Sequence, residues 1–197
     1  MASQDSAVVL VLIKMDTASP ERIPVVRENI RQFNPKAAVL ETAMPITVDH
    51  PHLIKGKRVL VIEDGPTLTH GGMSFGAGVL AAKQQGASEL VDPRAYAVGT
   101  IQQIFVQYPH IGSLLPAMGY GATQVREVEG TINRVPCDVV LVATPVDLGR
   151  IISINQPTCR VTYRLEEQGT LGFRDVLKGI ILKAKGDESF SRRMPQR

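Results

Sequence analysis

The densest group of side chains able to act on a ligand lies in residues 63–78. An apolar run over residues 59–62 leads into Glu63 and Asp64, and a carboxylate at the end of a strand can hold a magnesium ion through water. His70 adds an imidazole donor to the same segment. These positions make Asp64 and His70 the candidate catalytic residues, and Asp64 also the candidate metal ligand.

Two hydroxyls and two glycines in the same segment indicate contact with an anion. Thr67 and Thr69 offer hydroxyl donors, and Gly71 and Gly72 would let the backbone approach a phosphate closely. A helix predicted to begin at about Ser74 would direct its N-terminal amides and the positive end of its dipole toward the same anion. The alternative is a plain strand–turn–helix connection, but a structural turn does not need so many donors.

Polar side chains also follow two other predicted strands. Ligands of open α/β sheets sit beyond the carboxyl ends of the strands. The apolar run at residues 139–143 is followed by Thr144 and Asp147, and a shorter predicted strand at residues 89–91 is followed by Arg94. Thr144, Asp147 and Arg94 therefore join the candidate substrate or phosphate contacts.

A third apolar run, at residues 7–13, ends in Lys14, Met15 and Asp16. This spacing resembles the N-K-x-D motif of GTPases, in which the aspartate accepts from guanine N–H groups and the lysine stem lies along the ring. Ile13 stands at the asparagine position, so the motif is incomplete. Lys14 and Asp16 are the candidate nucleotide-base residues.

These side chains need a scaffold, and the apolar runs predict one. Strands without polar alternation are buried on both faces, which indicates a mostly parallel sheet covered by helices. The predicted helices cover residues 20–33, 74–85, 124–134 and 173–183, and the predicted shorter strands cover residues 37–41, 89–91 and 159–165. Alternation of strands and helices predicts a three-layer α/β fold.

Composition predicts one domain with a tail. Residues 1–183 are predicted to form an α/β domain, and residues 184–197 a basic, disordered tail. The net charge is +3, but residues 183–197 hold five Lys or Arg against two Asp or Glu, so the remainder is balanced. A nucleic-acid face needs clustered Lys and Arg on the folded body, so nucleic acid is not an expected partner.

The two cysteines, Cys137 and Cys159, have neither metal nor disulfide spacing. The apolar runs are too short to cross a bilayer. Both features predict a cytoplasmic protein without membrane contact.

One nucleotide-binding motif is missing. A P-loop needs G-x-x-x-x-G-K-[ST], and neither Gly-Lys-Ser nor Gly-Lys-Thr occurs in the chain. The nearest string, Gly72-Met73-Ser74, has methionine at the lysine position. We therefore expect that the chain alone is not a working P-loop hydrolase.

Several longer strings carry a resemblance to a known family. EDGPTLTHGG at residues 63–72, VDPRAYAV at 91–98, LPAMGYG at 115–121 and TPVDL at 144–148 are the main ones. With KMDTAS at 14–19, they resemble the C-terminal half of the predicted GTPase family related to cyclic 2,3-diphosphoglycerate synthetase. The similarity extends to about residue 183.

The resemblance implies a GTPase-like, P-loop-type fold and phosphoryl or cyclic phosphoanhydride chemistry with Mg²⁺ and GTP or ATP. It also implies that a P-loop half precedes Lys14, where this sequence has 13 residues. Two interpretations stay open. The chain is an enzyme component whose P-loop comes from a partner chain, or it is a non-catalytic module that binds a phosphorylated ligand. A nucleotide or phosphorylated small molecule, a P-loop-bearing chain and a homo-oligomer are the expected partners.

Overall fold

The computed structural model describes residues 9–16, 18–119, 121–169 and 171–181. The chain divides into two compact units, and each is described by itself. One unit is Ile46–Thr162, and the other combines Met1–Pro45 with Tyr163–Arg197. The predicted tail at residues 184–197 lies outside the described residues, and the prediction of one domain over residues 1–183 stays a prediction.

The unit of residues 46–162 contains a six-stranded sheet around β4. Strand β4 pairs in parallel with β5, β6 and β7, and β7 pairs in parallel with β8. The strands are β3 (Ile46–Val48), β4 (Arg58–Asp64), β5 (Glu89–Leu90), β6 (Leu115–Ala117), β7 (Val139–Ala143) and β8 (Thr158–Tyr163). The predicted burial of residues 59–62 and 139–142 is confirmed, because parallel strands in mid-sheet are covered on both faces.

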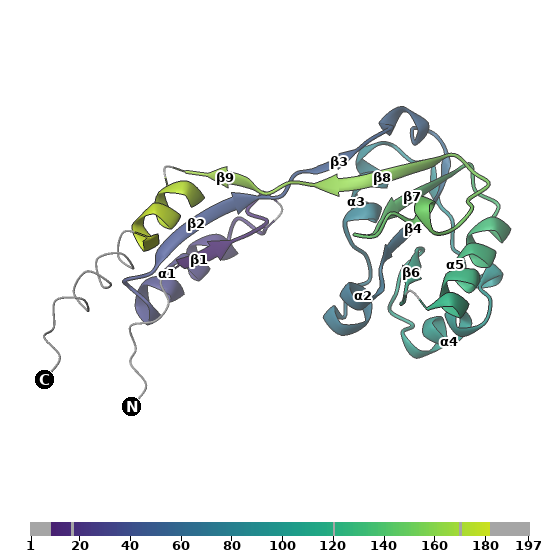
Figure 1. Cartoon of the computed structure of the whole chain (residues 1–197), viewed down its shortest axis with the longest axis horizontal. Coiled ribbons are helices and arrows are strands. Elements are labelled where there is room, and N and C mark those ends of the chain that lie inside the picture. Colours follow the sequence, from purple (N-terminus) through teal and green to yellow (C-terminus); the bar gives the residue numbers. More distant parts are fainter. Residues whose placement is uncertain (1–8, 17, 120, 170, 182–197) are drawn as a thin grey trace, which may run out of the picture. The chain divides into compact units, whose positions relative to one another are not determined.

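Helices cover both faces of this sheet. Figure 1 shows α3 (Ala77–Gln84) on one side of β4 and β7, with α4 (Thr100–Gln107) and α5 (Ala122–Arg134) on the other. Helix α5 turns Val128 and Ile132 inward at helical spacing. A short helix, α2 (Gly65–Gly71), follows β4 directly. Three 3₁₀ turns complete the unit: η1 (Pro51–Leu53), η2 (Arg94–Tyr96) and η3 (Leu148–Arg150).

In its described residues, the other unit consists of a small sheet and two helices. Strand β1 (Val9–Leu12) pairs in parallel with β2 (Ala38–Ala43), and β2 pairs antiparallel with β9 (Glu166–Gln168). Helix α1 is Arg22–Phe33, and residues 173–181 form a further helix. The prediction of a strand buried on both faces is wrong for residues 9–13, because β1 is an edge strand and leaves Val11 and Ile13 exposed. The α/β class predicted for the chain is confirmed.

Helix α2 was not predicted, and its ends have clear local causes. Pro66 occupies the first turn, where its fixed φ suits a helix and its missing N–H is not needed. Gly72 ends the helix with φ 61°, a left-handed conformation that glycine adopts without a Cβ penalty. The next helix, α3, begins at Ala77 rather than at Ser74. Residues that read as one ligand loop therefore fold as a strand end, a helix and a short connection.

Strand β6 lies in a segment for which the sequence predicts neither a strand nor a helix. Its Leu115 and Ala117 pair with Ile62 and Asp64 of β4. Among the described residues, no helix is long and apolar enough to cross a membrane.

Candidate functional site

Four strands of the larger unit bring their carboxyl ends to one edge of the sheet. Strand register places Asp64 of β4 beside Ala117 of β6, and Glu63 beside Ala143 of β7. On the far side of β7, Val142 pairs with Arg160 of β8. Neighbouring strands lie about 4.8 Å apart, so this edge runs continuously from β6 to β8. We call it the carboxyl edge.

Glu63 faces α3 and is buried in a hydrogen-bonded position. Its Oε1 accepts from the backbone N–H of Val79 at 3.0 Å and of Gly76 at 3.2 Å. Burial raises the pKa of the Glu63 carboxyl, and the N–H donors oppose that shift in part. The Glu63 carboxylate therefore accepts hydrogen bonds from backbone amides at the start of α3, where the sequence predicts a contact with a phosphate.

Two glycines make the close approach of α3 to this carboxylate possible. A Cβ on Gly76 would lie 2.4 Å from Oε2 of Glu63. A Cβ on Gly78 would lie 2.7 Å from Cγ1 of Val61 and 2.8 Å from Cβ of Ala143. The absence of a Cβ at both positions therefore lets α3 pack tightly on the sheet.

Asp64 lies on the opposite face of β4, because successive strand residues point to opposite sides. Its Oδ2 accepts from Oγ1 of Thr67 at 3.2 Å, one turn into α2. Gly65 lets the chain pass close to β6, since a Cβ there would lie 2.6 Å from the carbonyl oxygen of Ala117. In the described part of the chain, no three His, Cys, Asp or Glu residues gather as a metal cage. Asp64 can thus offer an ion one carboxylate, with the Thr67 hydroxyl beside it.

The remaining residues of the EDGPTLTHGG string lie along α2 and at its end. Oγ1 of Thr69 donates to the carbonyl oxygen of Gly65 at 3.1 Å and lies 3.1 Å from Nδ1 of His70. His70 is exposed, as are Gly71 and Gly72 at the C-terminus of α2. The dipole of α2 does not favour an anion there, because that end carries the partial negative charge. Among the candidate phosphate contacts of this string, only Thr67 is hydrogen-bonded to Asp64.

The connection after β7 forms a second part of the carboxyl edge. Thr144 is buried, and its Oγ1 donates to the carbonyl oxygen of Val146 at 2.7 Å. Oδ2 of Asp147 lies 3.2 Å from Nη1 of Arg160 and 3.4 Å from Nε of Arg150. Asp147 therefore takes part in a mixed-charge cluster, Asp147–Arg150–Arg160, that contains one more positive than negative side chain.

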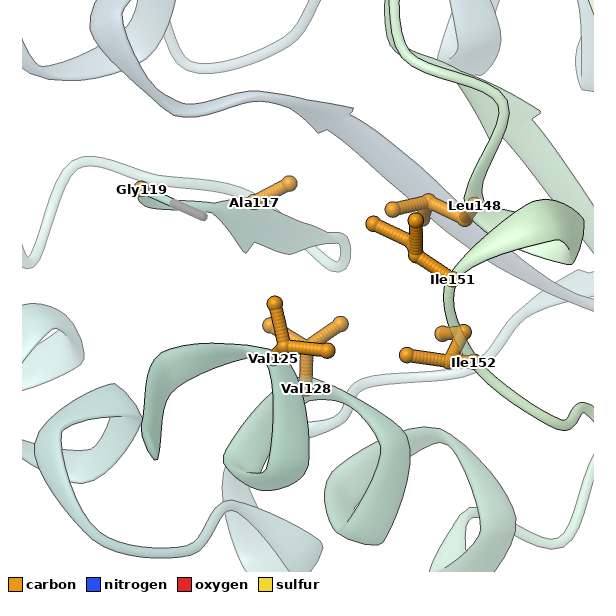
Figure 2. A pocket seen from close by; sticks show the side chains of 7 residues that line it. All are labelled: Ala117, Gly119, Val125, Val128, Leu148, Ile151 and Ile152. Carbon is orange, nitrogen blue, oxygen red and sulfur yellow. The ribbon is translucent and has the colours of Figure 1, made fainter. Parts of the chain in front are cut away.

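Apolar packing fixes the turn that carries Asp147. Figure 2 shows Leu148 and Ile152 facing Val125 and Val128 of α5 across a narrow gap. Leu148 and Ile152 are buried, and the cavity between the two sides measures about 10 Å³, room for about one water. The η3 turn is thereby held against α5.

Arg94 lies in the turn after β5, and β5 pairs with Arg58 and Val59 at the start of β4. Its guanidinium contacts Asp92 through Nη1 at 2.5 Å, donates to the carbonyl oxygen of Ile111 through Nη2, and lies over the Phe105 ring at 5.1 Å. These contacts tie the 92–94 turn to the segment after α4.

Lys14 and Asp16 follow β1 in the other unit. Lys14 has a φ of 59°, a left-handed conformation that is uncommon for a residue with a side chain. Oδ1 of Asp16 accepts from the backbone N–H of Met44 at 3.0 Å. The two candidate base-reading residues thus share one strand end of their own unit.

The sequence did not single out Glu63 and Arg160 as site residues. A signal for Arg160 was present, because residues 158–162 alternate between polar and apolar types as a half-covered strand does. Glu63 had no such signal, since two adjacent acids after a buried strand look alike in sequence. Only the pleat of β4 sends one to α3 and the other to the opposite face.

The chain was compared with known proteins and protein families. No protein-family model matches the chain. The chain is 56% identical over 173 residues to a protein named arginine synthetase ArcE from Thermococcus kodakarensis. The match covers 88% of this chain but only 39% of that relative's length. The similarity supports a synthetase-like role at a coarse level, and the relative is named neither as a GTPase nor as a cyclic 2,3-diphosphoglycerate synthetase.

Proposed function

We propose that this chain is the substrate-binding component of a nucleotide-dependent synthetase that forms arginine or a closely similar amino acid. The observation that carries the proposal is the 56% identity to an arginine synthetase over 173 residues. In this proposal the carboxyl edge of residues 46–162 binds the amino-acid substrate. Lys14 and Asp16 contact the nucleotide base, and a P-loop-bearing segment or chain supplies the Walker A motif that this sequence lacks.

The nucleotide in this proposal is GTP or ATP with Mg²⁺. Its γ-phosphoryl group is transferred to a substrate oxygen with release of GDP or ADP, and an amine nucleophile then displaces the phosphate as the new C–N bond forms. Mg²⁺ in such sites is held by one or two carboxylates, by phosphates and by waters rather than by a full protein cage. Asp64 with Thr67 fits that donor set, because one carboxylate and one hydroxyl lie together at the carboxyl edge. We assign them to the metal and its waters, and His70 to proton transfer.

Exposed apolar surface supports the requirement for further polypeptide. Helix α1 has no buried residue, and Phe33 at its end is 85% exposed. Strand β1 has no neighbour on its outer side among the described residues. Parallel sheets are normally covered on both faces, so a P-loop-bearing chain or a second copy of this chain would bury this surface.

The second candidate is a non-catalytic module that binds a phosphorylated ligand. The exposed His70 and the hydroxyl of Thr67 favour it, because both are accessible donors on one short helix. Replacing Thr67 and His70 together by alanine should then abolish binding of phosphorylated metabolites. Unchanged binding of every metabolite tested would remove this candidate.

The first test of the synthetase proposal is calorimetric titration with MgGTP and with MgATP. Asp16→Asn is the informative variant, because its amide oxygen can still accept from the Met44 N–H while the charge that binds the base is lost. We expect the wild-type chain to bind the nucleotide and the Asp16→Asn variant to bind it at least tenfold more weakly. A companion assay follows L-arginine-dependent exchange of labelled phosphate into GTP or ATP after a P-loop-bearing partner is added. No exchange with any such partner would refute the synthetase role.

A further inference from the structure

The Asp147–Arg150–Arg160 cluster is arranged as the complement of an amino-acid zwitterion. We propose that Arg160 binds the α-carboxylate of the substrate and that Asp147 binds its α-ammonium group. This proposal rests on the synthetase function proposed above and names the substrate class and the two residues that recognise it. It starts from the two side chains that β8 and the β7–η3 connection place side by side, 3.2 Å apart.

Arg160 retains unused donors. Its Nη1 faces Asp147, but its buried Nε has no hydrogen-bond partner among the described residues. A buried donor without a partner is costly, and most such groups in native structures are satisfied. The Nε and Nη2 atoms together form one edge of the planar guanidinium, the edge that binds a carboxylate through two parallel hydrogen bonds. A substrate carboxylate would satisfy this edge after a small opening of the cluster.

Asp147 retains an unused acceptor in the same way. Both arginines approach its Oδ2, and no described residue donates to Oδ1. The side chains of Asp147 and Arg160 are 34% and 32% exposed, so a small ligand can reach both. The ammonium and carboxylate of an α-amino acid are separated by one carbon, which matches two groups that already lie within 3.2 Å of each other.

The two side chains are held by different structures, so the pair has a defined spacing. The backbone N–H of Arg160 donates to Oδ1 of Asp49 at 2.8 Å, which fixes β8 at this point. Asp147 precedes the buried Leu148, which anchors η3 against α5 (Figure 2). Arg150 is 85% exposed, and we assign it only to the positive field of the cluster.

The test compares three ligands against two variants by calorimetric titration of the full chain. L-Arginine carries both groups, agmatine lacks the carboxylate, and 5-guanidinopentanoate lacks the ammonium. We expect Arg160→Gln to weaken the binding of L-arginine at least tenfold, because hydrogen bonds to charged groups are among the strongest in proteins. The affinity for agmatine should be unchanged. Asp147→Asn should weaken the binding of L-arginine to a similar extent and leave the affinity for 5-guanidinopentanoate unchanged.

Two further variants control for damage to the fold. Arg126→Gln makes the same substitution on an exposed arginine of α5 that lies outside the cluster, and it should bind all three ligands as wild type does. Arg160→Lys keeps the charge but loses the two-donor edge, and it should fall between wild type and Arg160→Gln. Circular dichroism of each variant checks that it is folded.

The outcomes separate this inference from the synthetase proposal. Equal weakening of all three ligands by Arg160→Gln, or no weakening, overturns the assignment of the carboxylate to Arg160. If neither substitution changes L-arginine binding or L-arginine-dependent exchange, this inference is overturned and the synthetase role remains. If the wild-type protein binds no L-arginine and shows no exchange, both this inference and the synthetase proposal are overturned.

Discussion

At the scale of single residues, the environment of the buried Glu63 carboxyl shifts its pKa. It accepts two backbone N–H groups of α3, and burial nevertheless raises its pKa above the ordinary value of 4.5. In the folded protein the neutral form is therefore favoured relative to the unfolded chain. The residue that caps α3 is thus also a source of pH-dependent stability.

We predict that Glu63→Gln changes the pH dependence of stability. Between pH 4.5 and the raised pKa, the folded wild type binds more protons at Glu63 than the unfolded chain does, so its free energy of unfolding falls as pH rises through this window. The glutamine variant keeps the Oε1 acceptor and loses this contribution. Urea denaturation at pH 4 and pH 7.5 should show wild type losing stability relative to the variant at the higher pH. The opposite trend would contradict the raised pKa.

Gly78 tests the close packing of α3. Alanine normally stabilises a helix relative to glycine by about 1 kcal/mol. At Gly78 the added Cβ would lie 2.7 Å from Cγ1 of Val61, so we predict that Gly78→Ala destabilises the protein by about 1–3 kcal/mol. Gly179→Ala is the matched control, because nothing lies within 4 Å of a Cβ there. Thermal unfolding should separate the two variants, and equal effects would show that α3 can shift away from the sheet.

At the scale of elements, the η3 turn depends on its apolar side. Leu148 is buried against α5, whereas the neighbouring Ile151 is 45% exposed. The turn carries Asp147 on its N-terminal side, so its rigidity sets the position of a substrate contact in the proposed site. Loss of the Leu148 side chain would loosen that contact as well as the core.

We predict that Leu148→Ala lowers the free energy of unfolding by about 2–5 kcal/mol, the usual result of removing a buried leucine side chain. Ile151→Ala should have a clearly smaller effect, because much of that side chain is already in water. Chemical denaturation of the two variants gives the comparison. If both variants lost the same stability, the turn would not be anchored through Leu148.

At the scale of the whole molecule, the hydrophobic core belongs to one unit. The buried apolar cluster runs from Ile54 to Val161 and lies wholly within Ile46–Thr162. In the other unit, the buried apolar residues are Leu40 and Ala43 among those described. Helix α1 adds none. The two units therefore differ in the amount of burial that can offset the loss of chain entropy.

Hydrogen exchange should reveal this difference. We predict that the amides of β4 and β7 exchange at least tenfold more slowly than those of β1 and α1, because local opening of a unit with few buried contacts requires less free energy. A P-loop-bearing partner that covers β1 and α1 should slow exchange there and leave β4 unchanged. Uniform protection across both units in the isolated chain would contradict the assignment of the core to Ile46–Thr162.

Much of the fold follows from local sequence patterns. The unbroken apolar runs of β4 and β7 identified two buried parallel strands, because residues covered on both faces cannot alternate with polar ones. The helix predicted at residues 124–134 is confirmed as α5. The same reasoning failed for β1, where an apolar run lies at the edge of a small sheet and remains partly exposed.

The α/β class and the carboxyl edge with Asp64, Thr144 and Asp147 can be inferred from the order of residues along parallel strands. Two contacts become visible only in the folded chain: Glu63 accepts hydrogen bonds at the start of α3, and Arg160 lies beside Asp147. The physical reason is that the first contact depends on the face to which a pleated strand turns each side chain. The second depends on strand register between β7 and β8, which joins residues 13 positions apart and leaves no periodic trace in the sequence.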